Sequence, residues 1–168
     1  MSSVNFKGNP VALSGNIPSV GTQAPDFTFV KADLSEGKLS DYADKIKVII
    51  AVPSLDTGVC NAETRRFNQL LGSKENVVGI VISKDLPFAM KRFCEIEGVQ
   101  NIVTASDFRY NAFGKAYNSD MIEGPLKGLS SRAVFVVDKN NEIKFVELVS
   151  EVTAEPVYEA IISAVDSL

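Results

Sequence analysis

The chain has 168 residues, a length typical of one domain, and its 45% apolar and 23% charged residues are those of an ordinary globular protein. Its 21 acidic residues outnumber its 17 basic residues, so the net charge of −4 offers no broad attraction to nucleic acid or to anionic membranes. The absence of histidine excludes a Ser–His–Asp triad, a Cys–His pair and imidazole metal ligands in the monomer, which leaves chemistry to thiols, carboxylates, hydroxyls, lysine and arginine.

The apolar patterns along the chain predict alternating strands and helices. Two short apolar runs around a Gly8-Asn9-Pro10 turn predict an N-terminal hairpin. Dense β-branched runs such as Lys47–Val52 predict strands that are buried on both faces. The expected strands are Val4–Phe6, Val11–Leu13, Asp26–Val30, Lys47–Val52, Val77–Ile82, Ile102–Thr104, Ala133–Val137 and Ile143–Val149. The expected helices are Leu39–Ala43, Gly58–Leu71, Pro87–Glu97, Phe108–Tyr117 and Glu155–Val165, the last with Val157, Ala160, Ile161, Ala164 and Val165 on one face.

The order of these elements predicts the fold class. Strand–helix–strand–helix followed by a hairpin and a last helix is typical of an α/β protein with a mixed central sheet. No repeat, low-complexity tract or linker interrupts residues 1–168, so we expect a single domain. Neither a dinucleotide-binding nor a phosphate-binding glycine motif occurs, and there is no Cys-x-x-Cys, so the sequence indicates no bound cofactor.

The start of the chain, MSSVNFKGNP, lacks the pattern of a secretion signal, and no apolar stretch is long enough to cross a bilayer. Two cysteines are too few for a disulfide scaffold. We therefore expect a cytoplasmic protein that binds neither membranes nor nucleic acid. In a reducing cytoplasm, a pair of cysteines is either inert packing or redox-active.

Cys60 is the residue that best fits chemistry. It ends the segment PSLDTGVC (residues 53–60), between a buried strand and the start of a helix, at the edge of an α/β sheet where ligands bind. If Thr57 is the N-cap, Cys60 is the third helical residue, where unpaired backbone N–H groups and the helix dipole favour an anion. Because the thiolate is the nucleophilic form of cysteine, this position favours a reactive sulfur.

A thiolate at this position needs a cation, because the neighbouring Asp56 carboxylate disfavours it unless that carboxylate faces solvent. Arg132 is the best candidate, since it stands alone at the start of a predicted strand and a guanidinium can hold both a thiolate and an incoming oxygen. Arg65 and Arg66, one turn beyond Cys60, are rivals.

The same residues also have ordinary structural interpretations. Cysteine is among the most often buried residue types, so Cys60 fits inert core packing, and Cys94 taken alone fits a core position better than a catalytic one. Thr57 fits a simple N-cap, Pro53 a strand end, and Arg132 a surface charge. The separation of 34 residues between the cysteines (94 − 60) matches no tight chelate, so we expect no metal site.

Longer strings in the sequence resemble one family. PSLDTGVC matches the P-x-x-x-[TS]-x-x-C active-site motif of the peroxiredoxins. The strings NFKGNPV, VPSLDTGVCNAETRRFNQL, SKDLPFAMKRFC and GPLKGLSSRAVFVVD resemble the bacterial thiol peroxidase subfamily, an atypical two-cysteine group, and the resemblance covers essentially the whole chain. It implies a thioredoxin-like fold with an N-terminal β-hairpin, in agreement with the strand order above.

The resemblance also implies a role for each matching residue. Cys60 matches the peroxidatic cysteine and Cys94 the resolving cysteine. Thr57 matches the hydroxyl that hydrogen-bonds the thiolate and the peroxide, Pro53 the residue that shields the site from water, and Arg132 the cation that activates both. These roles are implied by the resemblance, whereas the helix position only made Cys60 plausible.

A cofactor-free cycle is implied as well. The Cys60 thiolate reduces hydrogen peroxide or an organic (alkyl or lipid) hydroperoxide, becomes a sulfenic acid, and forms a disulfide with Cys94 that thioredoxin reduces, in antioxidant defence. The resemblance further implies a homodimer. Phe88, Met90 and Phe93 are candidates for an apolar wall that suits organic hydroperoxides.

The proposed disulfide requires the two cysteines to approach each other. A disulfide needs Cα atoms roughly 4.4–6.8 Å apart, yet Cys60 and Cys94 fall on different predicted helices, so we expect low local stability at the Cys60 turn or in Lys84–Gly98.

Two other functions stay open. One is a thiol–disulfide oxidoreductase on the same fold, against which the missing Cys-x-x-Cys argues. The other is a non-catalytic redox sensor or binding module.

Overall fold

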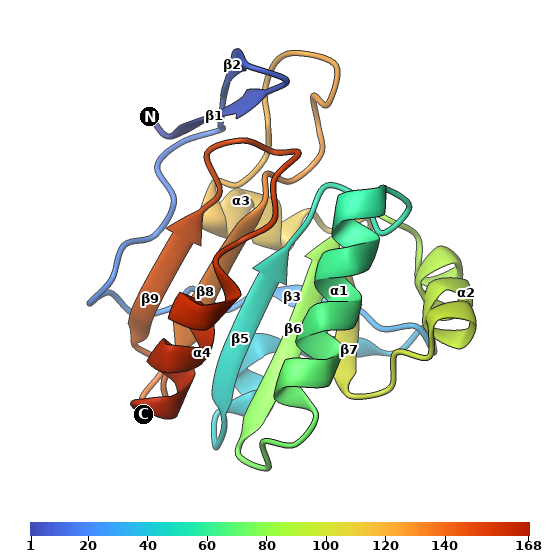
Figure 1. Cartoon of the computed structure of the whole chain (residues 1–168), viewed down its shortest axis with the longest axis vertical. Helices are drawn as coiled ribbons and strands as arrows, with labels where there is room; N and C mark the ends of the chain where they lie inside the picture. The colour runs from blue at the N-terminus through green and yellow to red at the C-terminus, as the bar shows by residue number, and fades with distance from the viewer.

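The computed structural model describes residues 1–168 as a mixed α/β fold with one large sheet and a small N-terminal hairpin (Figure 1). Seven strands form the large sheet in the order β4-β3-β7-β6-β5-β8-β9, and β1 pairs with β2, which confirms the predicted fold class. The strands are β1 (Ser3–Phe6), β2 (Asn9–Ala12), β3 (Thr28–Val30), β4 (Glu36–Lys38), β5 (Ile46–Ala51), β6 (Val77–Ser83), β7 (Ile102–Ser106), β8 (Ala133–Val137) and β9 (Ile143–Leu148). The helices are α1 (Gly58–Leu71), α2 (Pro87–Glu97), α3 (Ala112–Tyr117) and α4 (Tyr158–Asp166), with a 3-10 helix, η1 (Leu39–Tyr42). No helix combines the length and the apolar character needed to cross a membrane.

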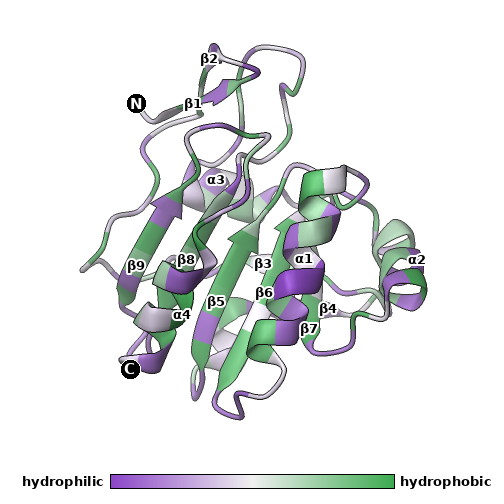
Figure 2. Cartoon of the chain, in the orientation of Figure 1, coloured by the Kyte–Doolittle hydropathy of each residue, from purple (hydrophilic) through white to green (hydrophobic).

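The central strands are buried on both faces, as their β-branched runs predict. Strands β5, β6 and β7 run parallel, and β8 lies antiparallel beside β5. Every residue of β5 and β8 is buried, and Figure 2 shows this part of the sheet as predominantly hydrophobic. The charged exception is Lys47, which is 1% exposed and whose Nζ donates to the Tyr42 carbonyl at 3.5 Å.

Two hydrophobic clusters cover opposite faces of the sheet. One cluster joins α1, α2 and α4 to the sheet and includes Cys60 and Phe67. The other joins α3 and η1 to the opposite face through Phe113 and Tyr117. In Figure 1, α1 and α4 lie in front of the sheet, α3 lies behind it, and α2 stands at the edge beyond β7. Cys60 therefore lies in the first cluster, where α1 leaves the carboxyl end of β5.

The predicted N-terminal hairpin is present, with its turn one residue earlier than expected. Lys7 and Gly8 have positive φ angles of 51° and 80°, which a tight turn requires and glycine adopts without strain. The Glu151 carboxylate accepts a hydrogen bond from the backbone N–H of each of these residues, both at 3.0 Å. These two bonds fasten the hairpin to the segment that follows β9.

Helix α3 is shorter than predicted and begins at Ala112, not at Phe108. Asn111 adopts a left-handed conformation with φ 49°, which ends any helix before it. The Asp107 carboxylate accepts hydrogen bonds from two backbone N–H groups of the helix that follows, so this polar residue belongs to a turn. Strand β4 was not predicted, because its residues EGK have a low preference for strands.

Helix α4 begins at Tyr158, three residues later than predicted. Pro156 disfavours a helical conformation for Glu155, the residue before it. The Glu147 carboxylate accepts a hydrogen bond from the Val157 backbone N–H, at 3.1 Å. The predicted apolar face is therefore wrong in part: Val157 and Ala160 are exposed, Ala164 is half-buried, and Ile161 and Val165 are buried.

Candidate active site

Cys60 is the third residue of α1, as the capping pattern predicts. Thr57 is the N-cap in an extended conformation, and its Oγ1 accepts a hydrogen bond from the Cys60 backbone N–H at 3.2 Å. Thr64 Oγ1 donates to the Cys60 carbonyl at 2.8 Å. The Cys60 side chain is fully buried. The sulfur therefore lies within the first turn of a helix, where the dipole and free N–H groups favour negative charge.

Strand pairing brings Arg132 to Cys60. Strand β8 begins opposite the carboxyl end of β5, where Ala133 pairs with Ala51. Arg132, the residue just before β8, therefore lies beside the loop that leads from β5 into α1. Arg132 Nη2 donates a hydrogen bond to Cys60 Sγ at 3.3 Å, and the side chain is 2% exposed. The rival cations Arg65 and Arg66 are exposed on α1 and engage other groups. The structure thus brings together the predicted sulfur and the preferred cation.

Glu63 is the charged residue of this site that the sequence analysis did not single out. Arg132 Nη1 donates to the Glu63 carboxylate, and Arg132 Nε donates to the Val152 carbonyl at 3.0 Å. Glu63 is fully buried, and its second oxygen, Oε1, has no hydrogen-bond partner. Burial raises the pKa of Glu63 to about 7, although Arg132 lowers it. Arg132 therefore faces two acidic groups, the Glu63 carboxyl and the Cys60 thiol.

The spacing of buried positions along α1 marks Glu63 as an unusual residue. The buried residues of α1 follow a helical spacing from Cys60 onwards, and Glu63 is one of them: Cys60, Glu63, Thr64, Phe67 and Leu71. A carboxylate on the apolar face of a helix has to be paired, because an isolated buried charge is strongly unfavourable. The pattern therefore indicated a buried cation near Cys60, although it did not identify Arg132.

The loop between β5 and α1 contains the remaining candidates near Cys60. Pro53 is buried just after the end of β5. Asp56 is exposed, so solvent weakens any repulsion between its carboxylate and a Cys60 thiolate. The Asp56 carboxylate is therefore exposed to solvent, which is the condition stated above for a thiolate at Cys60.

Cys94 lies on α2, partly buried and packed against the cluster that contains Cys60. Both cysteines are free thiols, and no disulfide joins them. Burial raises the pKa of the Cys94 thiol, while a hydrogen bond with Thr104 lowers it. Figure 1 shows α2 set apart from α1 at the edge of the sheet. The two sulfurs therefore belong to separate helices, as predicted.

A cavity of about 320 Å³ lies between the first turn of α1 and helix α2. Phe93 lines it, whereas Met90 is fully buried in the core and Phe88 lies in a different, exposed patch. The predicted apolar wall therefore reduces to Phe93 with its neighbours on α2. The lining residues are Leu55, Asp56, Thr57, Gly58, Asn61, Arg65, Ala89, Arg92, Phe93, Ile96 and Glu97.

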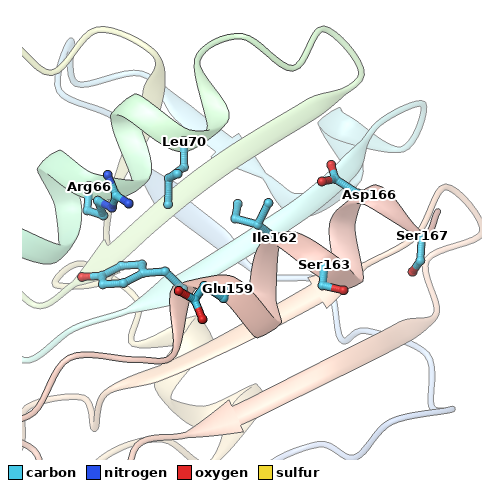
Figure 3. Close-up of a pocket in the computed structure, with 8 residues that line it drawn as sticks. Arg66, Leu70, Glu159, Ile162, Ser163, Asp166 and Ser167 are labelled. Carbon is cyan, nitrogen blue, oxygen red and sulfur yellow. The ribbon is translucent and has the colours of Figure 1, made fainter.

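A larger cavity, of about 610 Å³, lies between α1 and α4. Figure 3 shows Leu70 of α1 and Ile162 of α4 pointing toward one another across it, with Arg66 and Glu159 nearby. The residues that line it include neither cysteine, and its hydroxyl groups belong to Tyr158, Ser163 and Ser167. The groove therefore offers apolar contact but not the paired thiol and guanidinium found at Cys60.

The fold and the site together define a thioredoxin-like peroxiredoxin, with a buried thiol in the first turn of a helix beside a buried guanidinium. The Redoxin family model matches residues 19–162. A thiol peroxidase of Leptospira interrogans is 53% identical over 169 residues, which cover 99% of both chains. A thiol peroxidase of Aquifex aeolicus is 47% identical and covers 98% of this chain and 97% of its own.

Solved structures agree with these matches. A peroxiredoxin-like protein from Aquifex aeolicus superimposes with a TM-score of 0.94 at 46% identity, over 98% of this chain and 96% of its own. A thiol peroxidase from Chromobacterium violaceum has the same fold, with a TM-score of 0.90 over 98% of this chain and 95% of its own, at 24% identity. The chain belongs to the redoxin family and, within it, to the thiol peroxidases, which confirms the resemblance found in the sequence.

Proposed function

We propose that the protein reduces hydrogen peroxide and organic hydroperoxides in antioxidant defence, with Cys60 as the peroxidatic cysteine. The observation that carries this proposal is the 3.3 Å hydrogen bond from Arg132 to a fully buried Cys60 sulfur at a capped helix N-terminus. A guanidinium and the free N–H groups of a helix both stabilise a thiolate. The membership of the chain among thiol peroxidases supports the same reaction.

In the first step, the Cys60 thiolate attacks the terminal oxygen of the hydroperoxide. A sulfur–oxygen bond forms, the oxygen–oxygen bond breaks, and the departing alkoxide or hydroxide takes a proton, which gives a sulfenic acid and an alcohol or water. Arg132, the Thr57 hydroxyl and the backbone N–H groups stabilise the negative charge as it moves from sulfur to oxygen. Pro53 shields the sulfur from water, and Glu63 holds Arg132 in place.

In the second step, the Cys94 thiol condenses with the Cys60 sulfenic acid, which forms a disulfide and releases one water molecule. An external dithiol reduces this disulfide, and we propose thioredoxin as the dithiol. A cycle that depends on such a reductant belongs in a reducing compartment, so we infer that the protein acts in the cytoplasm. The partly buried position of Cys94 beside the Cys60 cluster supports its role as the resolving cysteine.

The Cys94→Ser variant tests this assignment. We expect it to reduce one equivalent of peroxide and then accumulate a Cys60 sulfenic acid that dimedone traps, because no second thiol condenses with it. Turnover linked to thioredoxin should fall at least about 100-fold, since the disulfide substrate of thioredoxin is missing. Stopped-flow peroxide consumption and mass spectrometry of the dimedone adduct measure the two effects. Unchanged turnover with thioredoxin would remove Cys94 from the cycle.

We also propose that two copies associate through an exposed apolar patch beside α2, defined as Leu34, Leu86, Phe88 and Phe108. Their exposed fractions are 48%, 46%, 67% and 66%, and they surround a cavity of about 440 Å³. A contiguous group of large exposed apolar side chains is typical of a protein–protein interface. This surface supports the homodimer that the family resemblance implies.

The Phe88→Glu variant tests the dimer. A carboxylate buried in an apolar interface is strongly unfavourable, so we expect sedimentation velocity to show monomers at concentrations where the unmodified protein is dimeric. Val157→Glu, an exposed apolar residue before α4 with 56% exposure, is the matched control and should leave the dimer intact. A dimer that survives Phe88→Glu would place the interface elsewhere.

A further inference from the structure

Asp85 lies between β6 and α2, two residues before the helix that carries Cys94. Its carboxylate accepts three hydrogen bonds. Oδ1 accepts one from Ser54 Oγ at 2.8 Å, and Oδ2 accepts one from the Leu55 backbone N–H at 2.8 Å and one from Ser83 Oγ at 2.6 Å. One side chain thus ties the base of α2 to the loop that leads to Cys60.

The hydrogen bonds continue from Asp85 to the sulfur-bearing residue. The Ser54 carbonyl accepts hydrogen bonds from the Thr57 backbone N–H at 3.2 Å and from Thr57 Oγ1 at 3.3 Å. Thr57 Oγ1 in turn accepts the hydrogen bond of the Cys60 N–H. Asp85 itself is held on β7, because Ser106 Oγ donates to its carbonyl at 2.5 Å. The Cys60 turn is therefore fixed to the sheet through Asp85.

The same contacts oppose a bond between the two cysteines. Cys60 is fully buried, and a cavity of about 320 Å³ separates its turn from α2, which carries Cys94. A disulfide needs Cα atoms roughly 4.4–6.8 Å apart, whereas both thiols are free and belong to helices on opposite sides of this cavity, so we infer that residues 53–60, residues 84–98 or both move before the sulfurs join. The two segments are joined at Asp85, whose carboxylate accepts hydrogen bonds from Ser54 and Leu55.

We propose that Asp85 is a positioning residue, which holds the Cys60 turn in the arrangement that reduces peroxide and has to release Ser54 and Leu55 before Cys60 and Cys94 join. This inference rests on the proposed disulfide between those cysteines. The release breaks hydrogen bonds only, and the covalent step is unchanged: sulfenic acid and thiol give disulfide and water. Asp85 thereby favours the first step of the cycle and slows the second.

The Asp85→Asn variant separates these two steps. The amide keeps the size of the carboxylate but carries no negative charge, so the hydrogen bonds from Ser54, Leu55 and Ser83 are no longer made to an ion. Weakening hydrogen bonds to a charged group in this way shifts a local opening equilibrium by about 10- to 100-fold. We therefore expect faster formation of the disulfide by up to that factor, and slower reduction of peroxide by Cys60. Stopped-flow measurements in the presence of Cys94, and in a Cys94→Ser background, give the two rate constants separately.

Three further variants keep the experiment decisive. Ser54→Ala removes one of the three hydrogen bonds to Asp85, together with the acceptor of the Asp56 backbone N–H, and should change both rate constants in the same directions by less. Asp44→Asn makes the same change of charge at an exposed carboxylate without hydrogen bonds, and should change neither. Leu39→Val weakens the core on the opposite face of the sheet, so it lowers the free energy of unfolding without touching the Cys60 turn.

The outcomes are distinguishable. If mass spectrometry finds no Cys60–Cys94 disulfide in the unmodified protein, the proposed cycle itself is wrong. If the disulfide forms but its rate is unchanged in Asp85→Asn and in Ser54→Ala, the role of Asp85 is overturned and the cycle stands. If both rate constants fall together in Asp85→Asn, or change as they do in Leu39→Val, Asp85 is structural only. Opposite changes in the two rate constants support the inference.

Discussion

We expect the replacement of Cys60 by serine to abolish peroxide reduction. We expect the second-order rate constant to fall by more than about 1,000-fold, because a serine hydroxyl stays protonated where a thiol ionises and is a far weaker nucleophile toward a peroxide oxygen. The hydroxyl also lacks the charge that Arg132 stabilises through its 3.3 Å contact with the sulfur. Peroxide consumption by purified protein, followed by stopped flow, measures the effect.

The smaller oxygen leaves the fold in place, because the Thr57 cap and the Thr64 hydrogen bond involve only the backbone of residue 60. Circular dichroism and thermal unfolding of the Cys60→Ser variant therefore serve as the control. Full peroxide reduction by this variant contradicts the proposed function. Disulfide reduction without peroxide, measured on the unmodified protein, distinguishes a peroxidase from the thiol–disulfide oxidoreductase considered above.

Replacing Arg132 by methionine has the second largest expected effect. The guanidinium is the only cationic side chain that contacts the Cys60 sulfur, so its loss removes stabilisation of both the thiolate and the departing oxygen. Loss of one such donor typically costs about 100- to 1,000-fold in rate. We expect a decrease of that size in the rate constant for peroxide reduction. Arg132→Lys should recover only part of it, because an ammonium cannot hold the sulfur, Glu63 and the Val152 carbonyl together.

The same change also destabilises the fold. Glu63 is fully buried and already has one oxygen without a partner, so removing Arg132 leaves a buried acid that either stays charged with no cation or has to take up a proton. Removing one partner of a buried ion pair typically costs about 3–5 kcal/mol, which urea unfolding detects. Adding Glu63→Gln should restore much of that stability but none of the activity. A double variant as active as the unmodified protein would contradict the catalytic role of Arg132.

The local structure around Cys60 was predictable because it depends on neighbouring residues. A strand of β-branched residues, a threonine N-cap and a cysteine three residues later determine the bounds of α1 and the position of the sulfur in its first turn. Capping and strand burial act over a few residues, so the sequence pattern contains them. The beginning of α3 was missed because the left-handed Asn111 and the hydrogen bonds to the Asp107 carboxylate determine it. The beginning of α4 was missed because Glu147, ten residues earlier, accepts the hydrogen bond of the Val157 N–H.

The sequence by itself determined the family, the strand and helix order and the residue that bears the sulfur, since these follow from local preference and from a motif. The sequence ranked Arg132 first among three candidate cations, and the tertiary structure decided between them, because Arg132 arrives through the pairing of β8 with β5 and lies 72 positions along the chain from Cys60. It also decided that Glu63 shares this guanidinium and that Asp85 anchors the loop of the site. Contacts of this kind arise from burial and strand register, which no single stretch of sequence contains.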